Sequence, residues 1–137
     1  MEGANHILAI EDNATTVLVV DDEPAILQML GMALPHYGFV ARLATTGRKA
    51  VEIYRRHHES IDVVLLDVQM NGMDGPQTLA ALQVVNPAVR CCFMSASTGN
   101  HSPADLMPLG AAHFFQKPFH SLASLACALR QVATSEA

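Results

Sequence analysis

Charged side chains are scarce in this 137-residue sequence. They make up 15% of the residues, with eight Lys and Arg against thirteen Asp and Glu, and the formal net charge is −5. The basic residues form no cluster larger than the pairs Arg48-Lys49 and Arg55-Arg56. Proteins that bind nucleic acid directly present a basic surface to the phosphates. The composition therefore argues against direct nucleic-acid binding.

Long apolar stretches and a disulfide pattern are also absent. No apolar run approaches the roughly 20 residues needed to cross a bilayer, and the N-terminus lacks the charged and apolar regions of a signal peptide. The three cysteines form no disulfide framework, and we interpret them as small buried side chains in a reducing compartment. We therefore expect a cytoplasmic protein that does not associate with membranes.

What the sequence does contain is apolar residues, which make up 50% of the chain. A chain of this length and composition can bury enough surface to form one packed domain. Residues 1–15 show no sustained periodicity and end in a turn-rich stretch. We expect them to be an N-terminal tail or linker, and we place the folded domain at residues 16–134.

From residue 16 onward, short apolar runs alternate with helical patterns. Four runs are almost continuously apolar, as in parallel strands that helices cover on both faces: 16–20, 62–66, 89–94 and 111–115. A more polar run at 39–43 suits an edge strand. Five intervening segments repeat apolar residues at steps of three and four: 24–34, 47–57 (with Thr46 as candidate N-cap), 76–85, 103–109 and 122–132. The pattern predicts an α/β fold of the (βα)5 type, a doubly wound, flavodoxin-like parallel sheet with strand order 2-1-3-4-5.

Polar residues stand at the carboxyl ends of four predicted strands. Asp21-Asp22 follows the first strand, Asp67 the third, Ser95 the fourth and Lys117 the fifth. These strand ends meet at one edge of an open α/β sheet, where ligands bind. Taken alone, Asp21 and Asp22 could merely cap the helix that follows them. The joint placement of all these residues favours one pocket instead.

Three converging carboxylates need a cation. Two unit charges about 4 Å apart repel by about 4 kcal/mol at an effective dielectric constant near 20. A hard divalent ion such as Mg²⁺ suits a site with few carboxylates and room for water or phosphate oxygens. One carboxylate can then attack phosphorus, while a lysine and a serine hydroxyl interact with the phosphoryl oxygens. The residue types therefore fit a phosphoryl-accepting site.

Four motifs carry a family resemblance. Residues 17–24 (VLVVDDEP), 63–75 (VVLLDVQMNGMDG), 94–96 (MSA) and 114–119 (FFQKPF) resemble the receiver domains of response regulators in two-component signalling, the CheY-like family. The resemblance extends from about residue 16 to residue 132, and the motifs occur in the family's order and spacing. So many motifs in register are far more specific than any one of them.

The resemblance implies a role for each residue of the pocket. Asp67 would accept the phosphoryl group, while Asp22 would bind Mg²⁺ directly and Asp21 largely through water. The metal's remaining protein ligands would be Asp67 and the backbone carbonyl of Gln69. Lys117 would contact the phosphoryl group, and the peptide bond between it and Pro118 would be cis.

The resemblance further implies a conformational switch. Ser95 would move toward the phosphoryl group as Phe114 turns inward, which would change the face built by the fourth helix, the fifth strand and the fifth helix. The phosphodonor would be a histidine kinase or a phosphotransfer protein, and the output partner is not specified. A homodimer through the same face is one assembly that the resemblance allows. The protein would be a switch and not an enzyme, limited to self-phosphorylation from small phosphodonors and autodephosphorylation.

The sequence departs from the family pattern in the loop after Asp67. Such loops usually read Met-Pro-x-Met-Asp-Gly, and here Asn71 replaces the proline. We expect a less rigid loop as a result. Phe114 lacks the hydroxyl of the tyrosine found in other members, and Gln69 and Ser97 occupy positions that tune the lifetime of the phosphoaspartate.

Three other functions were weighed against the switch. A phosphatase of the haloacid-dehalogenase type needs an acid two residues after its nucleophile, where this chain has Gln69. A flavodoxin needs a phosphate-binding loop after the first strand, where the acidic Asp21-Asp22-Glu23 would repel the phosphate. A receiver that serves only for docking would lack some of the chemical positions, and all of them are filled here.

Overall fold

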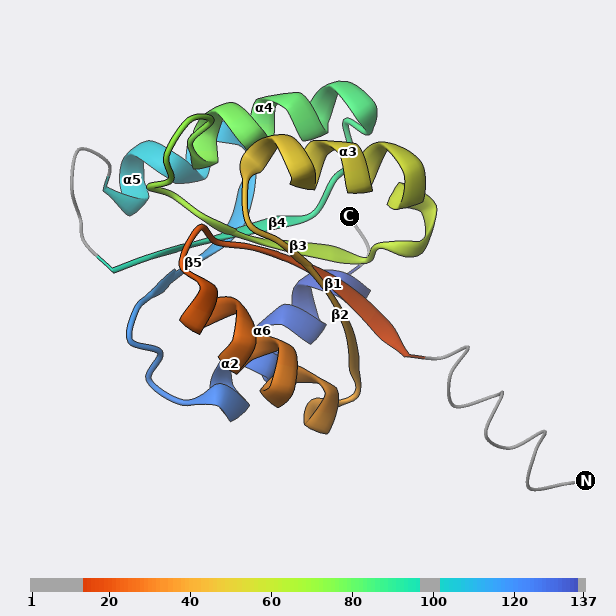
Figure 1. Cartoon of the computed structure of the whole chain (residues 1–137), viewed down its shortest axis with the longest axis vertical. Helices are drawn as coiled ribbons and strands as arrows, with labels where there is room; N and C mark the ends of the chain where they lie inside the picture. Colours follow the sequence, from red (N-terminus) through yellow and green to blue (C-terminus); the bar gives the residue numbers. More distant parts are fainter. Residues whose placement is uncertain (1–13, 97–101, 136–137) are drawn as a thin grey trace, which may run out of the picture.

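The fold was analysed in a computed structural model, which describes residues 14–96 and 102–135. Five parallel strands form one sheet in the order β2-β1-β3-β4-β5 (Figure 1). The strands are β1 (Thr15–Val20), β2 (Phe39–Ala44), β3 (Val63–Asp67), β4 (Cys91–Ser95) and β5 (Ala111–Gln116). The predicted fold class and strand order are confirmed, and every strand boundary lies within two residues of its predicted place.

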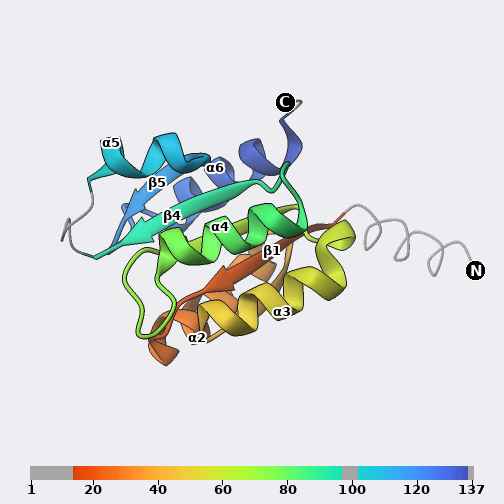
Figure 2. The same ribbon diagram turned by 90° about the horizontal axis from the view of Figure 1, so that it is seen from above.

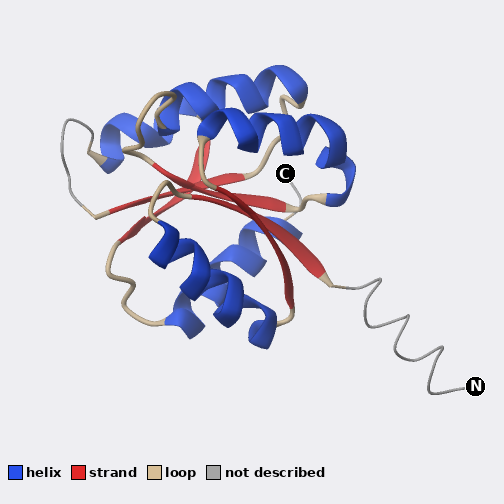
Figure 3. Ribbon diagram, in the orientation of Figure 1, coloured by secondary structure: helices blue, strands red, loops and turns tan. Residues whose placement is uncertain are grey.

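Helices cover both faces of the sheet (Figure 3). The helices form two groups on opposite faces, as the views in Figures 1 and 2 show. The first face carries α3 (Gly47–His57), α4 (Gly75–Val85) and α5 (Pro103–Leu106), and the second carries α2 (Pro24–Ala33) and α6 (Leu122–Thr134). Short 3₁₀ turns follow α2, α3 and α5 at η1 (Leu34–Tyr37), η2 (His58–Ser60) and η3 (Met107–Leu109).

The two layers of helices create two hydrophobic cores. Successive strand side chains point to opposite faces, so Leu18 and Val20 of β1 join one core while Val17 and Val19 join the other. Strands β3 and β4 are buried along their whole length. This double-sided burial is the physical reason for the continuous apolar runs in the sequence.

Two helices next to the candidate site begin at side-chain caps. The hydroxyl of Thr46 accepts a hydrogen bond from the backbone N–H of Lys49, so the predicted N-cap of α3 is confirmed. Helix α4 begins one residue earlier than predicted. Its N-cap is Asp74, which forms a capping box with Gln77. Both caps lie at the edge of the sheet where the strands end.

The predicted helix at 103–109 is wrong in its second half. Helix α5 ends at Leu106, and the chain continues as the 3₁₀ turn η3. Pro108 has no backbone N–H to donate, so a regular helix cannot continue through it. The burial expected for β5 is also incomplete, because this strand is the second edge of the sheet and Ala112, His113 and Gln116 are exposed.

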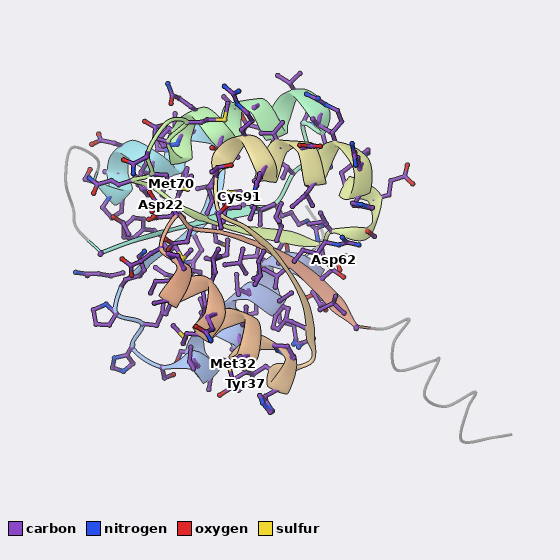
Figure 4. The ribbon with its side chains drawn as sticks, viewed as in Figure 1. Asp22, Met32, Tyr37, Asp62, Met70 and Cys91 are labelled. Atoms are coloured by element: carbon purple, nitrogen blue, oxygen red, sulfur yellow. The ribbon has the colours of Figure 1, made fainter. Side chains whose placement is uncertain are left out.

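The expectation about the cysteines needs correction. Cys91 and Cys92 are buried as expected, but Cys127 is exposed on α6. Met32 lies on α2 (Figure 4), and 68% of its surface is exposed. Single exposed apolar residues are common on helices, because a helix periodicity fixes the buried stripe only approximately. Within the described residues, no helix is both long enough and apolar enough to span a bilayer.

Candidate functional site

The candidate site lies at the carboxyl edge of the sheet, where the predicted polar residues come together. Val20 of β1 pairs with Leu66 of β3, so Asp21 and Asp67 follow at adjacent positions. In Figure 4, Asp22 and Met70 lie at this end of the sheet and Asp62, which precedes β3, lies at the other. The backbone N–H of Asp21 donates to Ala44, at the end of β2. Backbone pairing thus fixes where these side chains begin.

Three carboxylates form the centre of the site. Oxygen atoms from Asp21, Asp22 and Asp67 all lie within 4.8 Å of one another. Asp21 is completely buried and Asp67 is 5% exposed, while Asp22 is half-buried at the rim. The predicted convergence of the three acids is therefore present in the structure. Such a spacing of carboxylate oxygens around one point suits a divalent cation with an oxygen-ligand preference.

Lys117 supplies the positive charge of the site. Its Nζ donates a hydrogen bond to Asp21 Oδ2 at 2.8 Å and lies 3.5 Å from Asp67 Oδ1. Its backbone N–H donates to the carbonyl of Ser95, which joins the ends of β4 and β5. The Lys117–Pro118 peptide bond is cis, as the resemblance implied. One ammonium group faces three carboxylates, so a net negative charge remains when all three are ionised.

Burial and charge shift two pKa values in the site. Burial, together with the nearby charge of Asp21, raises the pKa of Asp67 from 3.8 to about 6, although Lys117 acts in the opposite direction. Burial lowers the pKa of Lys117, but its hydrogen bond to Asp21 and the charge of Asp67 outweigh that effect and raise the pKa overall. At neutral pH the site therefore holds an ionised Asp67 at an energetic cost, which a bound cation would reduce.

The other predicted site residues occupy neighbouring positions. Ser95 ends β4 and is 3% exposed. Phe114 lies in β5 opposite Phe93, half-buried against the core under α3, α4 and α5. Gln69 is exposed in the loop after β3. Ser97 and residues 1–13 lie outside the described residues. The ligand role of the Gln69 carbonyl and the switch role of Phe114 stay predictions.

Helix capping does not account for the first acidic pair. The N-cap of α2 is Glu23, whose side chain makes no capping hydrogen bond. Asp21 Oδ1 accepts from the backbone N–H of Glu23, while its other oxygen holds Lys117. Asp22 bonds across to the loop after β3, through the backbone N–H of Asn71. Both acids therefore belong to the pocket and not to the helix terminus.

Two features of this loop were not predicted from the sequence. The first is the backbone contact of Asn71 with Asp22, since the replacement of proline was expected only to make the loop less rigid. The second feature is the close packing of backbone around Gly75. A Cβ at Gly75 would lie 2.6 Å from the carbonyl oxygen of Asp67 and 2.8 Å from Cα of Val68. The missing proline was the signal for the first feature, and the glycine that ends the loop motif was the signal for the second.

Comparison with known protein families identifies the arrangement. The profile of the response regulator receiver domain matches residues 17–129, which include all the site residues named above. The chain belongs to this family. It is thus a receiver domain of the kind found in response regulators of two-component signalling, a family of signalling switches whose members generally bind Mg²⁺ in an acidic pocket.

Individual relatives agree with the family assignment. The chain is 34% identical over 102 residues to the transcriptional regulatory protein ZraR of Escherichia coli K12, covering 74% of this chain and 23% of ZraR. It is 32% identical over 119 residues to the sensor kinase CckA of Brucella abortus, covering 87% of this chain and 12% of CckA. The chain therefore spans about a quarter or less of the length of these two relatives.

A solved structure shares both fold and sequence features. The structure of the CheX-CheY-BeF3-Mg²⁺ complex from Borrelia burgdorferi superposes with a TM-score of 0.78 at 27% identity, covering 89% of this chain and 90% of that chain. The receiver fold of this chain is thus found in proteins from different bacteria.

Proposed function

We propose that this receiver domain accepts a phosphoryl group on Asp67 from a histidine kinase or phosphotransfer protein, and that Mg²⁺ is required. The observation that carries the proposal is the position of Asp67. Its carboxylate lies 3.5 Å from the Lys117 ammonium and within 4.8 Å of oxygens from both other acids. A buried carboxylate beside one cation and two further acids leaves an excess of negative charge, which a divalent metal ion would offset while leaving room for phosphoryl oxygens on the metal.

Asp67, Asp22 and the Gln69 carbonyl would hold the metal, with Asp21 acting largely through water. When bound, Mg²⁺ supplies positive charge that neutralises the phosphoryl oxygens. Mg²⁺ usually keeps several waters and binds through one or two carboxylates, so a site in which Asp22 and Asp67 bind directly suits it. The Borrelia burgdorferi complex contains Mg²⁺, and the similarity of this chain to that complex supports the assignment.

In the transfer, an oxygen of Asp67 forms a new bond to phosphorus. The bond between phosphorus and the donor nitrogen of phosphohistidine breaks, and the nitrogen keeps the electron pair. Lys117 places its positive charge beside the incoming group, and the Ser95 hydroxyl donates a hydrogen bond to a phosphoryl oxygen. With a pKa of about 6, Asp67 is mainly ionised at neutral pH and so can act as the nucleophile.

The signal would leave through the face formed by α5, β5 and α6, which are the fourth helix, fifth strand and fifth helix of the fold. Ser95 and Phe114 lie behind this face, on the neighbouring strands β4 and β5. Their rearrangement would expose a different surface to an output partner or to a second copy of the chain. Three further predictions come from the sequence alone. We expect self-phosphorylation from small donors, autodephosphorylation and a cytoplasmic location.

The decisive experiment is intact-mass analysis after incubation with acetyl phosphate and Mg²⁺. We expect a single phosphoryl adduct on the wild-type chain and none on Asp67→Asn. Asp74→Asn is the matched control, because Asp74 lies in the same loop and asparagine can also cap α4. An adduct that persists in Asp67→Asn would overturn the assignment, and loss of the adduct in Asp74→Asn would point to a general loop effect.

A further inference from the structure

One contact of the site comes from the main chain of the loop after β3. The backbone N–H of Asn71 donates a hydrogen bond to Asp22 Oδ2, with 3.1 Å between nitrogen and oxygen. The bond joins the loop after β1 to the loop after β3, across 49 positions of sequence. A proline at position 71, the usual residue in such loops, has no N–H and could not form it.

We propose that the Asn71 N–H is a positioning donor, which holds Asp22 in the orientation required for Mg²⁺. The inference rests on the proposed metal site and names a residue that tunes it. Asn71 does not contact the metal, so its effect would pass entirely through the Asp22 carboxylate.

The three acids differ in how they are held. Asp21 is buried and has two partners, the Lys117 ammonium and the backbone N–H of Glu23. Asp67 is buried beside Lys117. Asp22 is half-buried, and within residues 14–96 and 102–135 its one hydrogen-bond partner is the Asn71 N–H. Asp22 therefore depends most on this single contact for a fixed position.

A carboxylate that is fixed before the metal arrives binds it more tightly. Outer groups that hydrogen-bond to a metal-binding carboxylate orient it, and their loss commonly weakens metal affinity by 10- to 100-fold. Asp22 is partly open to water, which can replace a lost donor, so a smaller effect is expected here. We expect removal of the N–H to weaken Mg²⁺ binding by about 3- to 10-fold.

The contact also links the metal site to the third helix of the fold. Asn71 lies three residues before Asp74, the N-cap of α4. The loop between them contains Met73, whose backbone carbonyl and Cβ would lie 3.1 and 3.2 Å from a Cβ at Gly47, the first residue of α3. A change in Asp22 on metal binding would therefore reach the loop that packs between α3 and α4.

Alanine and proline at position 71 separate the backbone donor from the side chain. Asn71→Ala keeps the N–H and removes the exposed side chain, whereas Asn71→Pro removes the N–H. Proline is the usual residue at this place in the family, so the fold should tolerate it. Since the chain has no tryptophan, Mg²⁺ binding is best followed by amide chemical shifts during titration with MgCl₂.

We expect Asn71→Ala to bind Mg²⁺ within about twofold of wild type, and Asn71→Pro to bind about 3- to 10-fold more weakly. Equal or tighter binding by Asn71→Pro would overturn the proposal, because stiffening of the loop would then matter more than the donor. If Asn71→Ala is weakened as much as Asn71→Pro, the side chain is responsible and the proposal is likewise wrong.

Amide hydrogen exchange tests the hydrogen bond without any metal. The Asn71 amide should be protected in the metal-free wild type and should exchange faster in Asp22→Ala. Equal exchange rates would show that the contact contributes nothing. If the wild-type chain does not bind Mg²⁺, the proposed metal site is wrong as well. If the wild type binds Mg²⁺ and the position-71 variants bind it equally well, only the proposed role of Asn71 is wrong.

Discussion

Replacing the phosphoacceptor candidate should make the metal-free protein more stable. Asp67 is 5% exposed, and burial beside Asp21 raises its pKa from 3.8 to about 6. At 1.36 kcal/mol for each pH unit, the difference corresponds to about 3 kcal/mol of lost stability once Asp67 is ionised. An asparagine at this place avoids the charge but still buries an amide and gives up the attraction of Lys117. We therefore expect Asp67→Asn to stabilise the chain by about 1–3 kcal/mol at pH 7.5.

The effect has a defined dependence on pH. The folded chain holds the Asp67 proton more tightly than the unfolded chain, because the pKa is raised on folding. The stability from protonated Asp67 is fully present below pH 3.8 and is lost as the pH rises through about 6. The gain from Asp67→Asn should therefore be near zero at pH 4 and reach its full size above pH 7.

Urea unfolding with EDTA at a series of pH values measures this difference directly. Glu52→Gln is a suitable control, because Glu52 is an exposed carboxylate paired with Arg56 and should change stability by less than about 1 kcal/mol. Saturating Mg²⁺ should stabilise wild type, by about 2.7 kcal/mol at 100 times its dissociation constant, and Asp67→Asn much less. If Asp67→Asn is no more stable than wild type at pH 7.5 without metal, the electrostatic account of the site is refuted.

Two further predictions concern the neighbours of Asp67. Lys117→Met should destabilise the metal-free protein by about 3 kcal/mol, because buried Asp21 loses its 2.8 Å partner, and Mg²⁺ should restore part of the loss in urea unfolding. Unchanged stability without Mg²⁺ would contradict the role of this ion pair. Gly75→Ala should cost about 2 kcal/mol or more and slow phosphorylation by acetyl phosphate, because its Cβ would meet the backbone of Asp67 and Val68. Gly72→Ala is the matched control, because no atom lies within 4 Å of a Cβ at this position. Only the φ of +76° should matter there, so we expect a loss of about 1 kcal/mol of stability and unchanged phosphorylation. Similar phosphorylation rates in the two glycine variants would rule out the steric argument.

The sequence predicted those parts of the fold that depend on local pattern. The buried strands could be found because helices cover both faces, and the start of α3 because Thr46 is a good cap. The end of α5 was misplaced because the apolar periodicity outweighed Pro108, which interrupts the helix. The exposure of Met32 and Cys127 depends on which part of each helix the sheet covers, and local periodicity defines that only approximately.

The candidate site was predictable as a set of residue types at strand ends. The topology brings Asp21, Asp67, Ser95 and Lys117 to one edge because all the strands run in the same direction. The Asn71–Asp22 bond was not predictable, because its donor is a backbone group that every residue except proline carries. The pKa of Asp67 likewise depends on burial and on the distances between charges, which a sequence does not contain.

The ion pair between Lys117 and Asp21 has a consequence for how the domain must be made. Its two residues lie 96 positions apart, directly after β1 and β5, so the pocket draws on both the first and the last strand of the described residues. While β5 is still inside the ribosome, the Lys117 ammonium cannot reach Asp21 and Asp67. Under the proposed function, the chain would therefore become able to accept a phosphoryl group only when synthesis of the domain is almost finished. By the same logic, two fragments split between β4 and β5 should be inert separately, and recovered phosphorylation on mixing them would report their reassembly.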